Sequence, residues 1–192
     1  MHPRLLLAAS LSLLVLGTAH AADPAAALYS DPQYGFSLRY PQGASVATGD
    51  QADGQFDLAG TTAVVVKLDD AAFKGTNLGE ASVGVGISDD PTTVTACAAG
   101  TPAQGEKATG SVTLGGVKFN RFTFEDAGAG NRYGTTSYRA VKDKRCYEIV
   151  EFLHWSAIEN YPAGAVKAFD RAKVDAALHA ITRSFAFTGK PT

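Results

Sequence analysis

Cysteine is scarce in this 192-residue chain, which contains only Cys97 and Cys146. Their spacing excludes a Cys-x-x-Cys redox centre, and a four-ligand zinc site would need two well-placed histidines beside them. A lipoprotein signal needs a cysteine at its cleavage point, and no cysteine lies near the amino terminus. The scarcity of cysteine therefore excludes a redox enzyme of that type and a lipoprotein.

The sequence motifs of common catalytic sites are also missing. The chain contains no Gly-x-Ser-x-Gly, no His-Glu-x-x-His and no Ser-x-x-Lys at the start of a helical pattern. Two glycine-rich segments, Gly115-Gly116 and Gly128-Ala129-Gly130, do not precede a helix start and so do not match a phosphate-binding loop. We predict no cofactor and favour a protein without catalytic activity.

The longest apolar run lies at the amino terminus. It extends from Leu5 to Gly17, follows the positive charge of Arg4 and precedes the small-residue sequence Thr18-Ala19-His20-Ala21. A run of this length is too short to cross a bilayer and is typical of a secretory signal. We predict that residues 1–21 are a signal peptide removed after Ala21. An uncleaved amino-terminal anchor is the alternative.

Cleavage after Ala21 leaves 171 residues, enough for one domain with a sizeable core. It removes Arg4 and no acidic residue, which leaves 16 basic and 19 acidic residues and a net charge of −3. A nearly neutral protein has no electrostatic reason to bind nucleic acid. We predict a periplasmic or secreted protein with a flexible leader over residues 22–28, a single domain over residues 29–188 and no transmembrane segment after cleavage.

An exported chain enters an oxidising compartment, where its two thiols are predicted to form a disulfide. A Cys97–Cys146 bond closes a loop of 50 residues. In the chain-entropy description, closing such a loop stabilises the folded state by about 4 kcal/mol. Two free thiols are the alternative. We interpret the disulfide as structural.

Alternating apolar residues and turn residues predict a mostly antiparallel sheet. Short turns rich in glycine or charge separate its strands, as in hairpins. The predicted strands cover residues 35–40, 63–68, 81–88, 111–114, 117–125, 132–142 and 145–155. Asp90-Pro91 opens a short helix that carries Cys97, and Asp170 caps a longer one with an apolar stripe from Val174 to Phe185. The order indicates an α+β domain, an antiparallel meander packed by helices.

Two segments resemble the PsbP-like domain family and its bacterial DcrB-like envelope relatives. Residues 29–41 (YSDPQYGFSLRYP) resemble the opening strand of these domains, and residues 181–187 (ITRSFAF) are similar to their closing helix and exit strand. Gln42-Gly43 depart from the family, in which an aromatic residue often follows the proline. The resemblance covers residues 29–188 and implies an α/β/α sandwich around an antiparallel sheet. It implies no catalytic residue, because the relatives share no catalytic motif with this chain.

His154 and His179 are the histidines that signal cleavage would leave. Glu151 and His154 point to opposite faces of the predicted strand 145–155, and Glu148 lies about 20 Å from His154 along it. The geometry of an extended strand therefore excludes a catalytic pair within this segment. An envelope hydrolase that recruits His154 or His179 by tertiary contact is the alternative to a protein without catalytic activity.

Asp69-Asp70 and Asp89-Asp90 each follow an apolar predicted strand. If these strands were parallel neighbours, their four carboxylates would converge and could bind calcium. Antiparallel pairing would place them at opposite edges, and helix capping alone explains Asp90 before Pro91. The two pairs are therefore weak calcium candidates, and we predict no metal.

Aromatic residues gather on the predicted meander and fall on both of its faces. Some of them belong to the core, but an aromatic surface can also bind a partner or an apolar ligand. Trp155 and Tyr138 are the first candidates for such binding. The sequence thus predicts an exported, non-catalytic binding or assembly module of the cell envelope, whose partner is an envelope protein or a small ligand.

The intact mass of protein recovered from the envelope fraction of an expressing bacterium tests the export prediction. We expect the mass of residues 22–192 less two hydrogens, because the leader is removed and the two thiols are oxidised. A mass that includes Met1, or alkylation of both cysteines without prior reduction, would contradict it.

Overall fold

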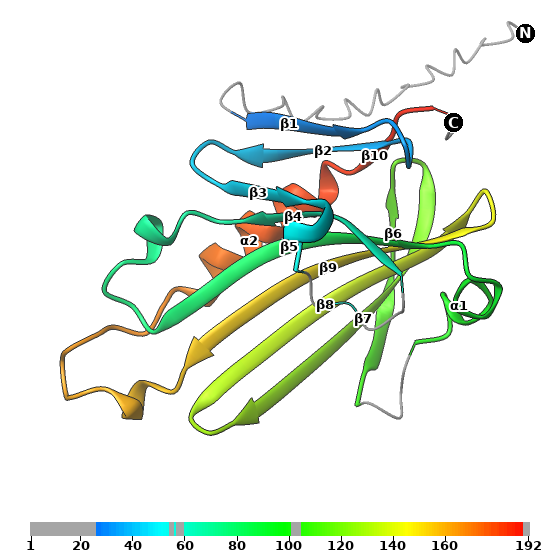
Figure 1. Cartoon of the computed structure of the whole chain (residues 1–192). Helices are drawn as coiled ribbons and strands as arrows, with labels where there is room; N and C mark the ends of the chain where they lie inside the picture. Colours follow the sequence, from blue (N-terminus) through cyan, green and yellow to red (C-terminus); the bar gives the residue numbers. More distant parts are fainter. Residues whose placement is uncertain (1–25, 54–55, 57–59, 101–104, 190–192) are drawn as a thin grey trace, which may run out of the picture.

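The computed structural model describes residues 26–53, 56, 60–100 and 105–189 (Figure 1). Within these residues the chain forms two antiparallel sheets. The larger has the strand order β3-β4-β5-β9-β8-β7-β6, and the smaller has the order β1-β2-β10.

The elements have the following bounds. The larger sheet contains β3 (Ser45–Thr48), β4 (Thr61–Lys67), β5 (Leu78–Ser88), β6 (Lys107–Leu114), β7 (Val117–Gly128), β8 (Asn131–Lys142) and β9 (Arg145–Ser156). The smaller sheet contains β1 (Ala26–Asp31), β2 (Phe36–Pro41) and β10 (Ala186–Phe187). The helices are α1 (Pro91–Ala96) and α2 (Arg171–Arg183), with short 3₁₀ turns η1 (Gly49–Gln51), η2 (Asp70–Phe73) and η4 (Ile158–Asn160).

Strands β6 to β9 form the meander that the turn residues predict. Each of its three hairpins turns through two residues with positive φ, namely Gly115-Gly116, Ala129-Gly130 and Asp143-Lys144. This type of turn has the twist that paired strands require. Strands β8 and β9 pair over their whole length up to Lys142 opposite Arg145, and β7 pairs with β8 from Asn120 to Gly128, which is opposite Asn131.

Helix α2 covers one face of the larger sheet, which we name face A. Asp170 caps the helix by accepting a hydrogen bond from the Lys173 backbone N–H at 3.0 Å. The apolar stripe of α2 is buried in the same core as the inward-facing residues of β4, β5 and β9. The smaller sheet covers another part of face A, where Phe36 stacks on Phe185 with ring centroids 5.3 Å apart. The core of the protein therefore lies between face A and these two layers.

The opposite face of the larger sheet, face B, carries the short helix α1. Asp90 caps α1 by accepting from the Thr93 backbone N–H at 2.8 Å. Cys97 follows directly and forms a disulfide with Cys146 of β9, with the two Cα atoms 5.7 Å apart. The predicted disulfide is thus confirmed, and the helices on both faces give the α/β/α arrangement that the resemblance implied (Figure 1).

Several predicted boundaries differ from the structure, two of them at the starts of β1 and β6. The flexible leader was predicted to end at residue 28, but β1 begins at Ala26 and pairs with β2 from Ala26 opposite Pro41. Strand β6 begins at Lys107 and not at Ser111, because its pairing with β7 continues through a polar stretch. In both segments the backbone hydrogen bonds to a neighbouring strand outweigh a weak side-chain pattern.

Among the described residues, no helix combines the length and apolar character needed to cross a membrane.

Burial of the α2 stripe leads to a prediction about stability. Leu178 is 1% exposed, whereas Leu28 on β1 is 54% exposed. Leu178→Ala should lower the free energy of unfolding by about 2–5 kcal/mol, because it removes buried methyl groups and leaves a cavity. Leu28→Ala should change it by less than about 1 kcal/mol. Urea unfolding followed by Trp155 fluorescence measures both, and equal effects of the two substitutions would contradict the placement of α2.

Candidate functional site

A cavity of about 160 Å³ lies between α2 and face A, over β7, β8 and β9. Its lining is mostly polar. The sheet contributes Arg121, Thr123, Gly134, Thr135, Thr136, Glu151 and Leu153, and α2 contributes Arg171, Asp175, Leu178 and His179. Most of these side chains are charged or carry a hydroxyl group.

The topology explains why these residues meet. Thr123, Thr136 and Glu151 are opposite one another on three adjacent strands, so their side chains share face A. Helix α2 packs on β2, β5 and β9, and β7 and β8 extend beyond it. Arg171, Asp175 and His179 recur every four residues and form one side of the helix. That side faces the uncovered strands and completes the cavity.

Glu151 is the buried acid of the cavity. Its side chain is 4% exposed, and its Oε2 lies 2.7 Å from Nδ1 of His179, which is 33% exposed. The Tyr138 hydroxyl donates to the other oxygen, Oε1, at 3.2 Å. Burial raises the pKa of Glu151 above its ordinary 4.5, while Thr182, His179 and Tyr138 act in the opposite direction.

Tyr138 connects Glu151 to Arg121. Burial and the charge of Glu151 raise the pKa of the Tyr138 hydroxyl, and the Arg121 guanidinium beside it lowers that pKa. The net direction is upwards, so the phenol keeps its proton and stays a hydrogen-bond donor at neutral pH. Arg121, Tyr138, Glu151 and His179 therefore form a continuous polar chain from β7 to α2.

The other end of the cavity is closed by Arg171. Its Nε donates to Asp175 at 3.0 Å, and its Nη2 lies 3.6 Å from Glu125 Oε1. The guanidinium stacks over the Trp155 ring at 5.0 Å. A Cβ atom at Gly134 would lie 3.4 Å from Arg171 Nη2, which places Gly134 directly beneath the guanidinium.

The two predicted binding residues lie beside the cavity and do not line it. Tyr138 is 6% exposed and reaches the site through Glu151. Trp155 packs on Phe169 and reaches the site through Arg171. Their role in binding stays a prediction, and the structure places each in contact with a residue that lines the cavity.

The two histidines proposed for a hydrolase lie on different faces of the larger sheet. His154 lies on face B, where it stacks on Tyr133 with ring centroids 4.9 Å apart and its Nε2 is 2.9 Å from Asn131 Oδ1. His179 is the histidine that tertiary packing brings to a carboxylate. Within β9, Glu148 and Glu151 serve opposite faces, as the strand geometry predicts.

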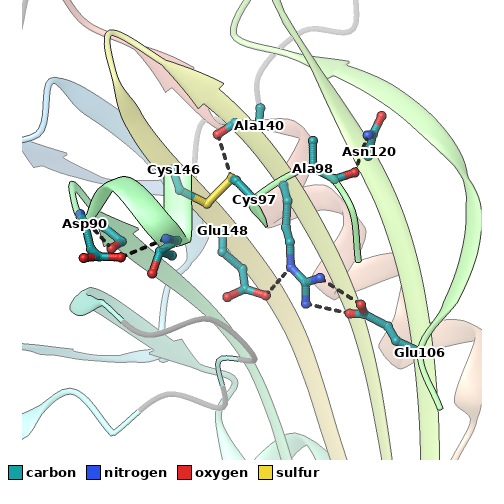
Figure 2. The surroundings of a disulfide bond; sticks show 11 residues. Asp90, Cys97, Ala98, Glu106, Asn120, Ala140, Cys146 and Glu148 are labelled. Atoms are coloured by element: carbon teal, nitrogen blue, oxygen red, sulfur yellow. Dashed lines mark hydrogen bonds and ion pairs between the residues drawn. A yellow bond between two sulfur atoms is a disulfide. The ribbon is translucent and has the colours of Figure 1, made fainter. Parts of the chain in front are cut away.

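The disulfide region on face B contains a second buried polar cluster (Figure 2). Arg139 donates from Nε to Glu148 at 2.8 Å and from Nη1 and Nη2 to Glu106 at 2.8 and 2.6 Å. Burial opposes the charge of Arg139, but the two glutamates outweigh it and raise the pKa of the guanidinium. Together with Cys97–Cys146, these bonds hold both ends of the segment after α1 against β8 and β9.

The parallel arrangement that the calcium candidates required is wrong. Strands β4 and β5 are antiparallel, so Asp69-Asp70 and Asp89-Asp90 follow them at opposite ends. Asp69 caps η2 by accepting from the Ala71 backbone N–H at 2.9 Å, and Asp90 caps α1. Over the described ranges, no group of three or more acidic, histidine or cysteine side chains is placed to hold a metal ion.

Sequence reasoning did not single out Arg121, Thr123, Thr136, Arg171 or Asp175. These residues lie on three different elements and match no known motif, so no local pattern in the sequence marks them as a site. Glu151 does have one, because it is an acid among the apolar residues of a single strand face, and such a residue requires a partner from elsewhere in the fold.

Comparison with known proteins places this chain among similar folds. No family model and no curated protein matches it. LpqN, described as involved in cell envelope biogenesis of Mycobacterium tuberculosis, has 11% sequence identity over 87% of each chain, with a TM-score of 0.47. The PsbP protein CyanoP from Synechocystis sp. PCC 6803 has 15% identity over 90% of this chain and 98% of its own, with a TM-score of 0.38.

The buried state of Glu151 leads to a pH-dependent prediction. Since the folded protein holds this proton more tightly than the unfolded chain does, the stability that it contributes is present below pH 4.5 and is lost as the pH rises through the raised pKa. Glu151→Gln removes this contribution. The variant should therefore gain stability relative to the wild type as the pH rises.

Urea unfolding at intervals between pH 4 and pH 8 measures this difference. Glu159→Gln, an exposed substitution on η4, controls for the loss of a carboxylate elsewhere. A stability difference between Glu151→Gln and the wild type that is the same at every pH would contradict the assignment.

Proposed function

We propose that this protein is an exported binding module that holds a small polar ligand in the cavity between α2 and face A. The observation that carries the proposal is the lining of the cavity, where charged and hydroxyl side chains from β7, β8, β9 and α2 surround one space of about 160 Å³. In binding pockets, a few polar groups placed in this way fix the orientation of a ligand. Polar side chains that served only to pack a helix on a sheet would cost free energy.

The framework around the cavity supports binding. Its residues lie on a 13-residue helix and on three 12-residue strands, not on loops. Side chains on such rigid elements hold their positions without a ligand, which lowers the entropy cost of binding. The rim is accessible, because Arg171, Asp175 and His179 are 41%, 36% and 33% exposed.

Surface chemistry favours a small ligand over a protein partner. Among the described residues, the exposed large hydrophobic side chains are Leu28, Val46, Val141 and Ile158, each from a different element. Protein interfaces usually contain a contiguous apolar centre, which these scattered residues do not form.

Export is the second part of the proposal. It is supported by the amino-terminal leader sequence and by the Cys97–Cys146 disulfide, a bond that persists in oxidising compartments.

Hydrolysis is the second candidate function, and one contact favours it. Nδ1 of His179 lies 2.7 Å from Oε2 of Glu151 without hydrogen-bond geometry, and a carboxylate beside an imidazole favours its action as a general base. No side-chain hydroxyl hydrogen-bonds to His179 within the described residues, so water would be the nucleophile. Turnover of a bound ligand that is lost in His179→Gln and kept in His154→Gln would establish this function.

A cavity-filling substitution tests the binding proposal. Thr136→Leu replaces a hydroxyl group that lines the cavity with a longer apolar side chain, a net gain of one non-hydrogen atom, whereas Thr113→Leu makes the same change at an exposed position of β6. We expect a thermal-shift screen of small polar molecules to give ligands that stabilise the wild type and Thr113→Leu but not Thr136→Leu. A ligand at 100 times its Kd should contribute about 2.7 kcal/mol. Ligands that stabilise Thr136→Leu equally, or a screen without ligands, would overturn the proposal.

A further inference from the structure

Arg121 is the cation of the cavity that no carboxylate neutralises. Its side chain forms part of the cavity wall, and its Nε is buried without a hydrogen-bond partner. Across the described residues, no carboxylate lies within ion-pair distance of this guanidinium. Its neighbour is the Tyr138 hydroxyl, which donates its own proton to Glu151.

Arg171 and Arg139 differ from Arg121, because each of them has carboxylate partners. Arg171 pairs with Asp175 and Glu125, and the buried Arg139 pairs with Glu106 and Glu148. A partly buried cation without a counter-charge is costly, and an anion that pairs with it recovers that cost. A bound anion would therefore supply the counter-charge for Arg121.

Two hydroxyl groups stand beside Arg121 on the same face. Thr123 follows it by two residues on β7, and Thr136 lies directly opposite Thr123 on β8. Both line the cavity. Guanidinium and hydroxyl donors around one point are suited to the two oxygens of a carboxylate, which accepts bonds in parallel from the planar guanidinium fork.

The charge and the volume of the cavity further restrict the class of ligand. The formal charges of Arg121 and Arg171 balance those of Glu151 and Asp175, so a bound monoanion adds one unbalanced negative charge to the cavity whereas a dianion adds two, which favours the monoanion. A cavity of about 160 Å³ is close to one that holds benzene, which indicates a ligand of about six to nine non-hydrogen atoms.

We infer that the cavity binds a compact organic monocarboxylate, with its carboxylate on Arg121 and on the hydroxyls of Thr123 and Thr136. This inference rests on the proposed function, because it names the ligand class of the same cavity. Arg171 and Asp175 face the opposite end of such a ligand, where they can donate to or accept from its remaining polar group.

Matched probes test the charge requirement on the mature protein with its disulfide intact. Lactate and benzoate carry a carboxylate, and lactamide and benzamide have nearly the same shape without the charge. Inorganic phosphate is the dianionic probe. Titrations followed by two-dimensional amide NMR give the affinity and show which residues respond. We expect lactate or benzoate to bind at least tenfold more tightly than its amide, with responding amides on β7, β8 and α2.

Substitutions of Arg121 test whether its guanidinium recognises the carboxylate of the ligand. Arg121→Gln should weaken carboxylate binding at least tenfold, and Arg121→Lys should weaken it less because the charge stays while the planar fork is lost. Lys118→Gln, on the opposite face of the same strand, should leave the affinity within twofold. If Arg121→Gln does not fold, Thr123→Val and Thr136→Val remove the hydroxyl donors and should each weaken carboxylate binding.

The outcomes separate this inference from the proposed function. Amides that bind in the cavity as tightly as the carboxylates, or phosphate that binds more tightly than both, would overturn the monocarboxylate inference while the binding module stands. Carboxylate affinity that is unchanged in Arg121→Gln would overturn it as well. If no probe gives a saturable response in the cavity, both proposals fail.

Discussion

The packing of α2 across face A is the constraint on which the candidate site depends. Val174, Leu178 and Ile181 are each at most 2% exposed, and burying such side chains contributes about 1.5–3 kcal/mol apiece. Because these three residues fix the rotation of the helix, Asp175 and His179 must lie at the edge of the contact. The cavity results from a difference in width, since α2 spans only part of a sheet that continues through β8 and β7.

The alternation of side chains along the strands gives the two faces different roles. Tyr138 and Arg139 are neighbours in sequence, yet Tyr138 belongs to the polar chain on face A and Arg139 to the buried ion cluster on face B. The cluster and the disulfide anchor the segment after α1, and breaking a buried ion pair of this kind costs about 3–5 kcal/mol. A rigid face B in turn supports strands β8 and β9, which carry most of the cavity floor. Face B therefore contains the contacts that stabilise the fold, and face A contains the candidate binding site.

Much of the fold could be predicted because its determinants are local. Hairpin turns such as Gly115-Gly116 and helix caps such as Asp170 act over a few residues, and the disulfide followed from there being only two thiols. The start of β1 at Ala26 was missed because an alanine-rich segment has no strand pattern of its own.

The candidate site could not be predicted in the same way. Its central contact joins Glu151 to His179, and only the docking angle of α2 decides which histidine meets that acid. Strand geometry correctly excluded a pair within β9, but it could not choose between His154 and His179. Arg121 could not be predicted for a related reason. An arginine in a strand is normally expected to be exposed to solvent, and only the position of α2 shows that this one borders a cavity.

A double-mutant cycle between Glu151 and His179 tests most directly whether α2 brings these two residues into contact. The free energies of unfolding of the wild type, Glu151→Gln, His179→Gln and the double variant are measured at one pH near neutrality. The account predicts that the two substitutions are not additive, with a coupling free energy of about 1 kcal/mol. Additive effects within about 0.3 kcal/mol would show that the two side chains do not interact and would contradict the site as described.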